Sequence, residues 1–181
     1  MAKFVTELTT AHRDFIARQK IYFVASAPHT GRVNLSPQGM DTFRVLSTTR
    51  VGYLDVTSSG NETSAHTLEN GRITFMFCSF ENNPNILRLY GKGFTILPGT
   101  KEWPEYAAQF EIYPSTRQII TADIDLVQTS CGFGVPLYFY QGERDIHFEW
   151  AEKKGEKGLK EYKELNNIKS LDGLPTPLGL K

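Results

Sequence analysis

Residues 58–66 of the 181-residue chain, SSGNETSAH, bring together side chains that can bind an anion. The stretch offers the hydroxyls of Ser58 and Thr63, the amide of Asn61 and the imidazole of His66. Hydroxyls and backbone N–H groups bind phosphate, and a helix that begins here adds partial positive charge at its N-terminus. Two interpretations are open: a phosphate cradle, or a solvated, capped turn that uses the same residue types.

A phosphate site also needs cations, and the neighbouring segments contain candidates. Arg44 lies in FRVL, residues 43–46, and Arg88 lies in ILRLYGKG, residues 86–93. Both segments are rich in the β-branched and aromatic residues that favour strands. Arg44 and Arg88 are therefore candidate phosphate ligands.

The familiar motifs of protein-borne catalysis are missing. The sequence contains no P-loop, no HExxH and no recognisable Ser-His-Asp set or carboxylate pair. Its two cysteines, Cys78 and Cys131, lie far apart, so we expect neither a metal site nor a disulfide framework. If the protein is an enzyme, a bound organic cofactor supplies the chemistry.

The composition narrows the range of partners and compartments. Twenty Lys and Arg residues balance twenty Asp and Glu residues, which argues against nucleic acid or an anionic membrane as the main partner. No apolar run approaches the length of a membrane span, and the N-terminus lacks the apolar core of a signal peptide. Together with the low cysteine content, these features predict a cytoplasmic protein.

The hydrophobic pattern predicts one mainly β domain with flanking helices. A first helix is expected at residues 7–20, with Thr9 or Thr10 as its N-cap. A barrel or sandwich follows over residues 21–145, and a charged helix and tail cover residues 148–181. Strands are expected at residues 21–27, 32–37, 43–47, 50–57, 72–80, 86–97 and 116–130, and a short helix at 103–110. The absence of βαβ units argues against a Rossmann fold.

The strand at residues 116–130 has the clearest alternation. Ile120, Ala122, Ile124 and Leu126 alternate with residues that are mostly polar. This pattern predicts an antiparallel strand with one buried face and one solvated face.

Several of these segments, taken in order, resemble one known family. The Asn-x-Ser-Pro step at residues 34–37, the Gly-Asn loop at 60–61, the NGR turn at 70–72 and the Gly-x-Gly end at 91–93 are similar to the pyridoxamine 5′-phosphate oxidase-related, flavin-binding split barrels. The resemblance covers residues 15–97. The later SCGFGVP and SLDGLP resemble an oxidase-like subgroup of the same family.

The resemblance implies a six-stranded antiparallel split β-barrel with Greek-key features. It also implies a homodimer that binds FMN noncovalently between its subunits. The implied cofactor-binding residues are Asn34, Leu35 and Ser36 beside the isoalloxazine ring, Ser58, Asn61, Thr63 and His66 around the ribityl chain and phosphate, and Arg44 or Arg88 of either subunit as the phosphate cation.

Two functions follow from the resemblance. The first is an FMN-dependent oxidoreductase that accepts a hydride from NAD(P)H or from a small reduced substrate. The alternative is a non-catalytic carrier or sensor that binds FMN, haem, a deazaflavin or pyridoxal phosphate. The loop 58–66 lacks the Arg or Lys of many relatives, and no Arg follows Arg144, where authentic pyridoxamine-phosphate oxidases carry an Arg-rich segment. We therefore expect weak or absent oxidation of pyridoxamine 5′-phosphate.

Overall fold

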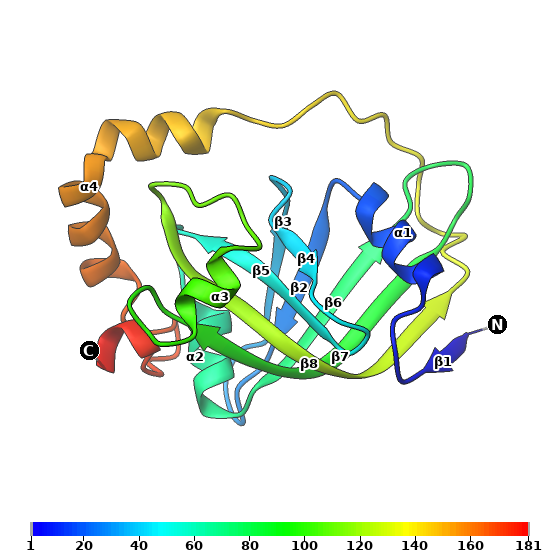
Figure 1. Ribbon diagram of the computed structural model, residues 1–181, viewed down its shortest axis with the longest axis horizontal. Coiled ribbons are helices and arrows are strands. Elements are labelled where there is room, and N and C mark those ends of the chain that lie inside the picture. The colour runs from blue at the N-terminus through cyan, green and yellow to red at the C-terminus, as the bar shows by residue number, and fades with distance from the viewer. Residues whose placement is uncertain (1, 181) are drawn as a thin grey trace.

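The computed structural model describes residues 2–180 and is built around one strongly curved antiparallel sheet (Figure 1). Its strands follow the order β3-β2-β6-β7-β8-β5-β4, and β1 pairs with β8. The strands are β1 (Lys3–Val5), β2 (Tyr22–Ser26), β3 (Asn34–Gln38), β4 (Phe43–Val45), β5 (Arg50–Val56), β6 (Arg72–Cys78), β7 (Ile86–Ile96) and β8 (Thr116–Ser130).

The predicted fold, a mainly β split barrel with flanking helices, is confirmed, but the number of strands differs. The sheet has eight strands instead of six. The additional strand β1 has only three residues, KFV, which are too few to show the alternation from which a strand is predicted.

Four helices flank the sheet: α1 (Thr10–Arg18), α2 (Glu62–Glu69), α3 (Trp103–Ala107) and α4 (Ile146–Asn166). Thr9 caps α1, because its hydroxyl accepts the backbone N–H of His12. Gly155 divides α4 with a φ of 63°, a conformation that favours glycine. The short 3-10 helix η1 (Pro177–Leu180) ends beside α2 (Figure 1).

Two apolar clusters hold the fold together. The main core lies within the curve of the sheet and includes the rings of Tyr22, Tyr53, Phe75 and Phe77. Tyr22 stacks on Phe77, with ring centroids 5.6 Å apart. A smaller cluster on the other face packs strands β5, β7 and β8 against α3, through Leu54, Ile96, Ile119 and Trp103.

A bulge changes the expected pattern of β8. The register of β7 and β8 shifts between Tyr90 and Gly91, where Tyr90 pairs with Leu126 and Gly91 pairs with Ile124. The extra residue reverses the inward and outward alternation beyond this point. Val127, rather than the predicted Leu126, therefore joins the main core.

The first half of β8 is also more buried than the alternation predicts. Residues 116–122 are all buried, including the polar Gln118 and Thr121. The helix α3 packs on Ile119, on the face that the sequence assigned to solvent. The helix α2 lies on the opposite face, next to the main core, and its hydroxyls contact Gln118 and Thr95. Ser64 Oγ lies 3.1 Å from Gln118 Oε1, and Thr67 Oγ1 lies 2.9 Å from Thr95 Oγ1.

Candidate functional site

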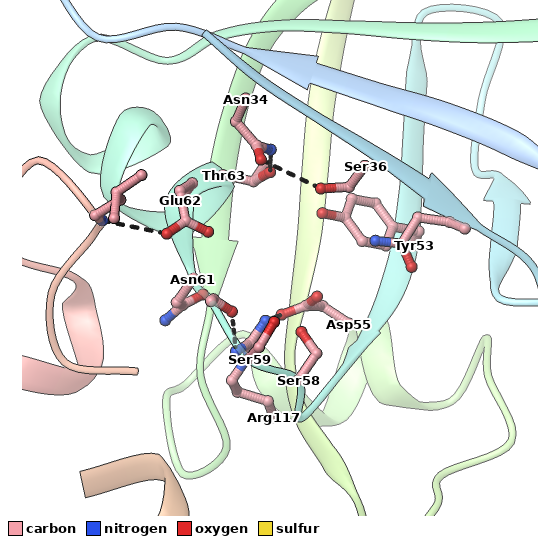
Figure 2. Close-up of a pocket in the computed structure, with 13 residues that line it drawn as sticks. Asn34, Ser36, Tyr53, Asp55, Ser58, Ser59, Asn61, Glu62, Thr63 and Arg117 are labelled. Atoms are coloured by element: carbon pink, nitrogen blue, oxygen red, sulfur yellow. Dashed lines mark hydrogen bonds and ion pairs between the residues drawn. The ribbon is translucent and has the colours of Figure 1, made fainter. Parts of the chain in front are cut away.

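A polar cavity of about 330 Å³ opens where β3, the end of β5, the start of β8 and the N-terminus of α2 meet (Figure 2). We call it the polar cavity. It is lined by Asn34, Ser36, Gln38, Tyr53, Asp55, Ser58, Ser59, Gly60, Asn61, Glu62, Thr63, Arg117 and Leu171. It thus includes most of the loop that the sequence singled out.

Strand β3 forms one wall of the polar cavity. Asn34, Ser36 and Gln38 share a face because side chains alternate along a strand. Asn34 Nδ2 donates to Thr63 Oγ1 at 3.1 Å, and Ser36 Oγ donates to Asn34 Oδ1 at 3.3 Å. The same alternation turns Leu35 to the opposite face, where it is 63% exposed. Of the three residues expected beside a flavin ring, two therefore line the polar cavity.

The N-terminus of α2 forms a second wall. Asn61 is the N-cap residue, but its side chain makes no capping hydrogen bond. Its Oδ1 accepts from Gln118 Nε2 at 2.7 Å, and its Nδ2 donates to the carbonyl of Asn167 at 2.9 Å. The first-turn N–H groups of α2 are left without a side-chain cap, and such groups carry the partial positive charge of the helix.

A buried ion pair forms the floor of the polar cavity. Arg117 Nη2 lies 2.8 Å from Asp55 Oδ2, and Gln118 Nε2 donates to the same oxygen at 2.7 Å. Arg117 Nη1 also donates to the carbonyl of Gly60 at 2.7 Å, which ties β8 to the loop before α2. Figure 2 shows Asp55, Ser58, Ser59 and Arg117 gathered at one end of the cavity.

Sequence reasoning missed Arg117, which is the cation at this site. A single signal was present: a charged residue at the start of a strand that continues, after Gln118, with the apolar Ile119 and Ile120. Its partner Asp55 is 62 positions away, so no local spacing connects the two residues. Their proximity follows from the pairing of β5 with β8.

The C-terminal segment closes the remaining side of the polar cavity. Asn167 Nδ2 donates to the carbonyl of Ser58 at 3.0 Å, and the backbone N–H of Leu171 donates to Glu62 Oε1 at 3.2 Å. The residues that follow α4 therefore hold both the loop and the first turn of α2.

Tyr53 connects the polar cavity to the main core. Its side chain is 1% exposed, and its ring packs edge-to-face on Phe75 with centroids 6.1 Å apart. Burial raises the pKa of the Tyr53 phenol well above its ordinary value. The phenol is therefore a neutral group of the cavity wall.

His66 lies outside the polar cavity. It is four positions after the first residue of α2, which places it about 6 Å further along the helix axis. There α2 packs on β2, and His66 Nδ1 lies 2.9 Å from Ser26 Oγ. His66 is 1% exposed, and burial lowers the pKa of its imidazole.

The two arginines expected at the phosphate also lie away from the polar cavity. Arg44 Nη1 donates to the carbonyls of Asp41 and Phe43, and the guanidinium lies 5.6 Å from the ring of Phe110. Arg88 Nη1 donates to Ser130 Oγ at 3.2 Å, near the far end of β8. Within one chain, the structure thus brings together Asn34, Ser36, Ser58, Asn61 and Thr63, but not Leu35, Arg44, His66 or Arg88.

Two classes of feature are not found among residues 2–180. No group of three or more His, Cys, Asp and Glu side chains is arranged to bind a metal ion in this part of the chain. No helix there combines the length and apolar character needed to cross a membrane.

Comparison with known proteins identifies the family. A family model described as pyridoxamine 5′-phosphate oxidase matches residues 8–131, which is more than half of the chain. The chain belongs to the pyridoxamine 5′-phosphate oxidase family. The matched region begins just before α1 and ends just after β8, so it contains all the strands around the polar cavity.

One relative extends the match to nearly the whole chain, and two solved structures share the fold. A pyridoxamine 5′-phosphate oxidase family protein of Aspergillus flavus, ustO, is 41% identical over 200 residues, covering 97% of this chain and 78% of the relative. HupZ from Group A Streptococcus, in its solved structure, is 18% identical with a TM-score of 0.56, over 68% of this chain and 99% of HupZ. The FAD-binding protein of Mycobacterium smegmatis is 13% identical with a TM-score of 0.50, over 70% and 97% of the two chains.

Proposed function

We propose that this member of the pyridoxamine 5′-phosphate oxidase family binds FMN in the polar cavity and is a flavin-dependent oxidoreductase. One observation carries the proposal. The uncapped N-terminus of α2 lines the same cavity as the hydroxyls of Ser58, Ser59 and Thr63 and the guanidinium of Arg117. Backbone N–H groups, hydroxyls and a cation form the donor set that a phosphate ester requires.

The residues of the polar cavity divide into two groups toward FMN. The first turn of α2, with Ser58 and Ser59, would bind the phosphate, and Arg117, whose charge is offset by Asp55, would hold the loop that carries these donors. Asn34 and Ser36 on β3 would bind the polar ribityl chain and the edge of the ring. When bound, FMN supplies hydride transfer, and the protein contributes position, electrostatics and exclusion of water.

The substrate of this oxidoreductase is proposed to be NAD(P)H or another small reduced molecule. Pyridoxamine 5′-phosphate is a poor candidate, because residues 145–181 contain no arginine that could form the Arg-rich segment named above. The carboxylates of the polar cavity are not acid–base catalysts: Asp55 is paired with Arg117, and Glu62 accepts the N–H of Leu171. Any proton transfer would therefore depend on the substrate or on water.

The pairing of both carboxylates with other residues also favours a second candidate function. A cavity whose titratable groups are all paired can hold a cofactor without turnover. We therefore keep a non-catalytic carrier or sensor of FMN, haem, a deazaflavin or pyridoxal phosphate as the alternative, which the reduction experiment below distinguishes.

We also propose that the protein is a cytoplasmic homodimer. A long connection joins β8 to α4 (Figure 1). It exposes a series of large apolar side chains, and exposed apolar segments of this kind mark interaction sites. They are Phe133, Leu137, Tyr138, Phe139 and Tyr140. The expectation that Arg44 or Arg88 of the other subunit binds the phosphate depends on this dimer. Light scattering that gives a monomer at micromolar concentration would contradict the dimer.

Purification without added cofactor tests the proposed function. We expect a yellow protein, and mass spectrometry of the denatured sample should identify FMN. The flavin band should bleach on anaerobic addition of NADPH or NADH. Bound flavin that no nicotinamide reduces would favour the carrier, whereas haem or no ligand, together with no binding of added FMN, would overturn the proposal.

A further inference from the structure

A second cavity, of about 590 Å³, adjoins the polar cavity, and we call it the apolar cavity. The two cavities share one lining residue, Gln38 at the end of β3. The apolar cavity is lined by Lys20, Ile21, Pro37, Gln38, Gly39, Met40, Gly142, Glu143, Arg144, Ile146, His147 and Trp150. Its volume lies within the roughly 300–1,000 Å³ of typical small-molecule sites.

The wall of the apolar cavity is suited to a flat, apolar group. The rings of His147 and Trp150 lie 5.8 Å apart at an interplanar angle of 32°, and both line the cavity. Ile21, Pro37 and Met40 add aliphatic surface. Aromatic walls of this kind bind aromatic ligands through offset stacking and edge contacts.

The backbone beside the apolar cavity is unusual. Met40 and Asp41 have φ values of 58° and 50°, in the left-handed region that non-glycine residues rarely adopt. Such conformations cluster at binding sites, where the surrounding structure maintains them. Met40 lines the cavity.

Two cations lie at the apolar cavity without an acidic partner. Among residues 2–180, neither Lys20 nor Arg144 takes part in an ion pair. Lys20 Nζ lies 5.8 Å from the ring of Tyr140. The carboxylate that lines the cavity, Glu143, accepts the Tyr140 hydroxyl at 2.8 Å.

The charged side chains at the apolar cavity favour a ligand with an anionic group. Lys20 and Arg144 contribute two positive charges and Glu143 one negative charge, which leaves a net charge of +1. His147 adds none near neutral pH, because burial lowers the pKa of its imidazole, and its Nε2 lies 3.0 Å from Ser115 Oγ. A net charge of +1 matches a carboxylate rather than a doubly charged phosphate ester.

We propose that the apolar cavity is the substrate site and that it binds a small aromatic carboxylate. The aromatic ring would pack on Trp150 and His147, and the carboxylate would pair with Arg144 and Lys20. Gln38, which lines both cavities, would contact both this ligand and the flavin. The role as a substrate site rests on the proposed function, whereas binding of the carboxylate does not.

Calorimetry on the flavin-free protein tests the proposal with three probes that share a phenyl ring. They are 3-phenylpropanoate, its neutral amide, and phenyl phosphate. We expect the carboxylate to bind about tenfold more tightly than the amide, which corresponds to one charge-assisted hydrogen bond. Equal binding of carboxylate and amide, tighter binding of phenyl phosphate, or no binding of the carboxylate at millimolar concentrations would overturn the proposal.

Variants assign the binding to this cavity. Arg144→Gln and Lys20→Gln should each weaken the binding of 3-phenylpropanoate by roughly tenfold, because each removes one positive charge. Both residues are exposed, and neither change should alter the binding of the amide. Trp150→Leu should weaken the binding of both 3-phenylpropanoate and its amide. Lys157→Gln, an exposed lysine of α4 outside the cavity, is the matched control and should weaken neither. An Arg144→Gln protein that binds the carboxylate as tightly as wild type overturns the site.

The proposed function can fail separately from this site. A protein that binds 3-phenylpropanoate as described but binds no flavin would retain the aromatic-carboxylate site and lose its redox role. A protein that binds FMN but not the carboxylate would retain the flavin site alone.

Discussion

Arg117 on β8 and Asp55 on β5 form an ion pair of 2.8 Å whose side chains are only 3% and 8% exposed. The pair forms the floor of the polar cavity. Arg117 also fixes the orientation of the loop before α2, because its Nη1 donates a hydrogen bond to the Gly60 carbonyl. A buried ion pair adds little net stability over an apolar pair, but removing one partner leaves an uncompensated charge. The pair therefore makes the geometry of the cavity dependent on both residues.

Replacing Arg117 should destabilise the fold strongly. We expect Arg117→Met to lower the free energy of unfolding by about 3–5 kcal/mol, because Asp55 remains buried without its partner. Arg50→Met breaks the Arg50–Asp123 pair, whose side chains are 45% and 48% exposed, and should cost about 0–1 kcal/mol. Urea unfolding of the two variants measures the difference. Equal costs would show that the burial of the Arg117 pair has no energetic consequence.

Thr63→Ala should affect cofactor retention more than folding. The Thr63 hydroxyl lines the polar cavity and accepts a hydrogen bond from Asn34. Its loss should weaken the binding of FMN by roughly tenfold. The matched control is Thr67→Ala, one turn further along α2, where the hydroxyl is buried against Ser64 and Thr95. It should lower the melting temperature of the apo protein and leave the affinity for FMN unchanged. The reverse result would make the loop a capped turn.

Glu62→Gln should tighten the binding of FMN. Glu62 is the first residue of α2 and lines the polar cavity, so its carboxylate repels a phosphate bound at the helix N-terminus. Glutamine keeps an oxygen that can accept the N–H of Leu171. We expect an increase in affinity of about threefold to tenfold, as one charge interaction of about 1 kcal/mol implies.

Riboflavin is the control for the Glu62 variant, since it lacks the phosphate. Fluorescence titration should give the same affinity of riboflavin for wild type and for Glu62→Gln. An equal gain for both ligands would place the phosphate elsewhere.

His66 should make stability depend on pH. Its folded pKa is lowered by burial, so unfolding below the unfolded pKa of about 6.5 takes up a proton. The stabilisation is therefore fully present above pH about 6.5 and is lost as the pH falls below it. The destabilisation caused by His66→Gln relative to wild type should shrink as the pH is lowered from neutrality. His29→Gln, at an exposed position, is the control, and a difference that stays constant with pH for His66→Gln would contradict the prediction.

Gly91→Ala on β7 should disrupt the pairing of β7 with β8 at the bulge. A Cβ at this position would clash with the Asp123 carbonyl oxygen and lie 3.0 Å from Ile124 Cα, so we expect a loss of about 1–3 kcal/mol. Gly158→Ala in α4 is the matched control, because its added Cβ would meet only ordinary contacts. That variant should instead gain up to about 1 kcal/mol of helix stability. Chemical unfolding of both variants gives the comparison, and a neutral Gly91→Ala would mean that the strands separate easily here.

The local sequence pattern was sufficient to predict most helices and strands of the fold. The strands at residues 50–56, 72–78 and 116–130 and the capped helix after Thr9 were predicted within a few residues, because alternation and capping are properties of neighbouring residues. The bulge at Gly91 was not predicted, since it depends on the register between two strands. For the same reason the exchange of Leu126 for Val127 in the core could not be foreseen.

The sequence by itself determined the types of donor at the candidate site and their order along the chain. Ser58, Asn61 and Thr63 were named from their residue types and Asn34 and Ser36 from motif resemblance, and all five line the polar cavity. Their hydroxyls and amides are local chemistry, and the turn and helix start between β5 and β6 are local structure. This part of the site needed no knowledge of distant contacts.

Only the tertiary structure decided which charges belong to the site. The pairing of β5 with β8 brings Arg117 to Asp55, and the packing of α2 on β2 buries His66 against Ser26. Both relationships join residues at least 40 positions apart, and no sequence spacing encodes them. A charge acts over a few ångströms in space, so its role depends on the pairing of strands rather than on its place in the chain.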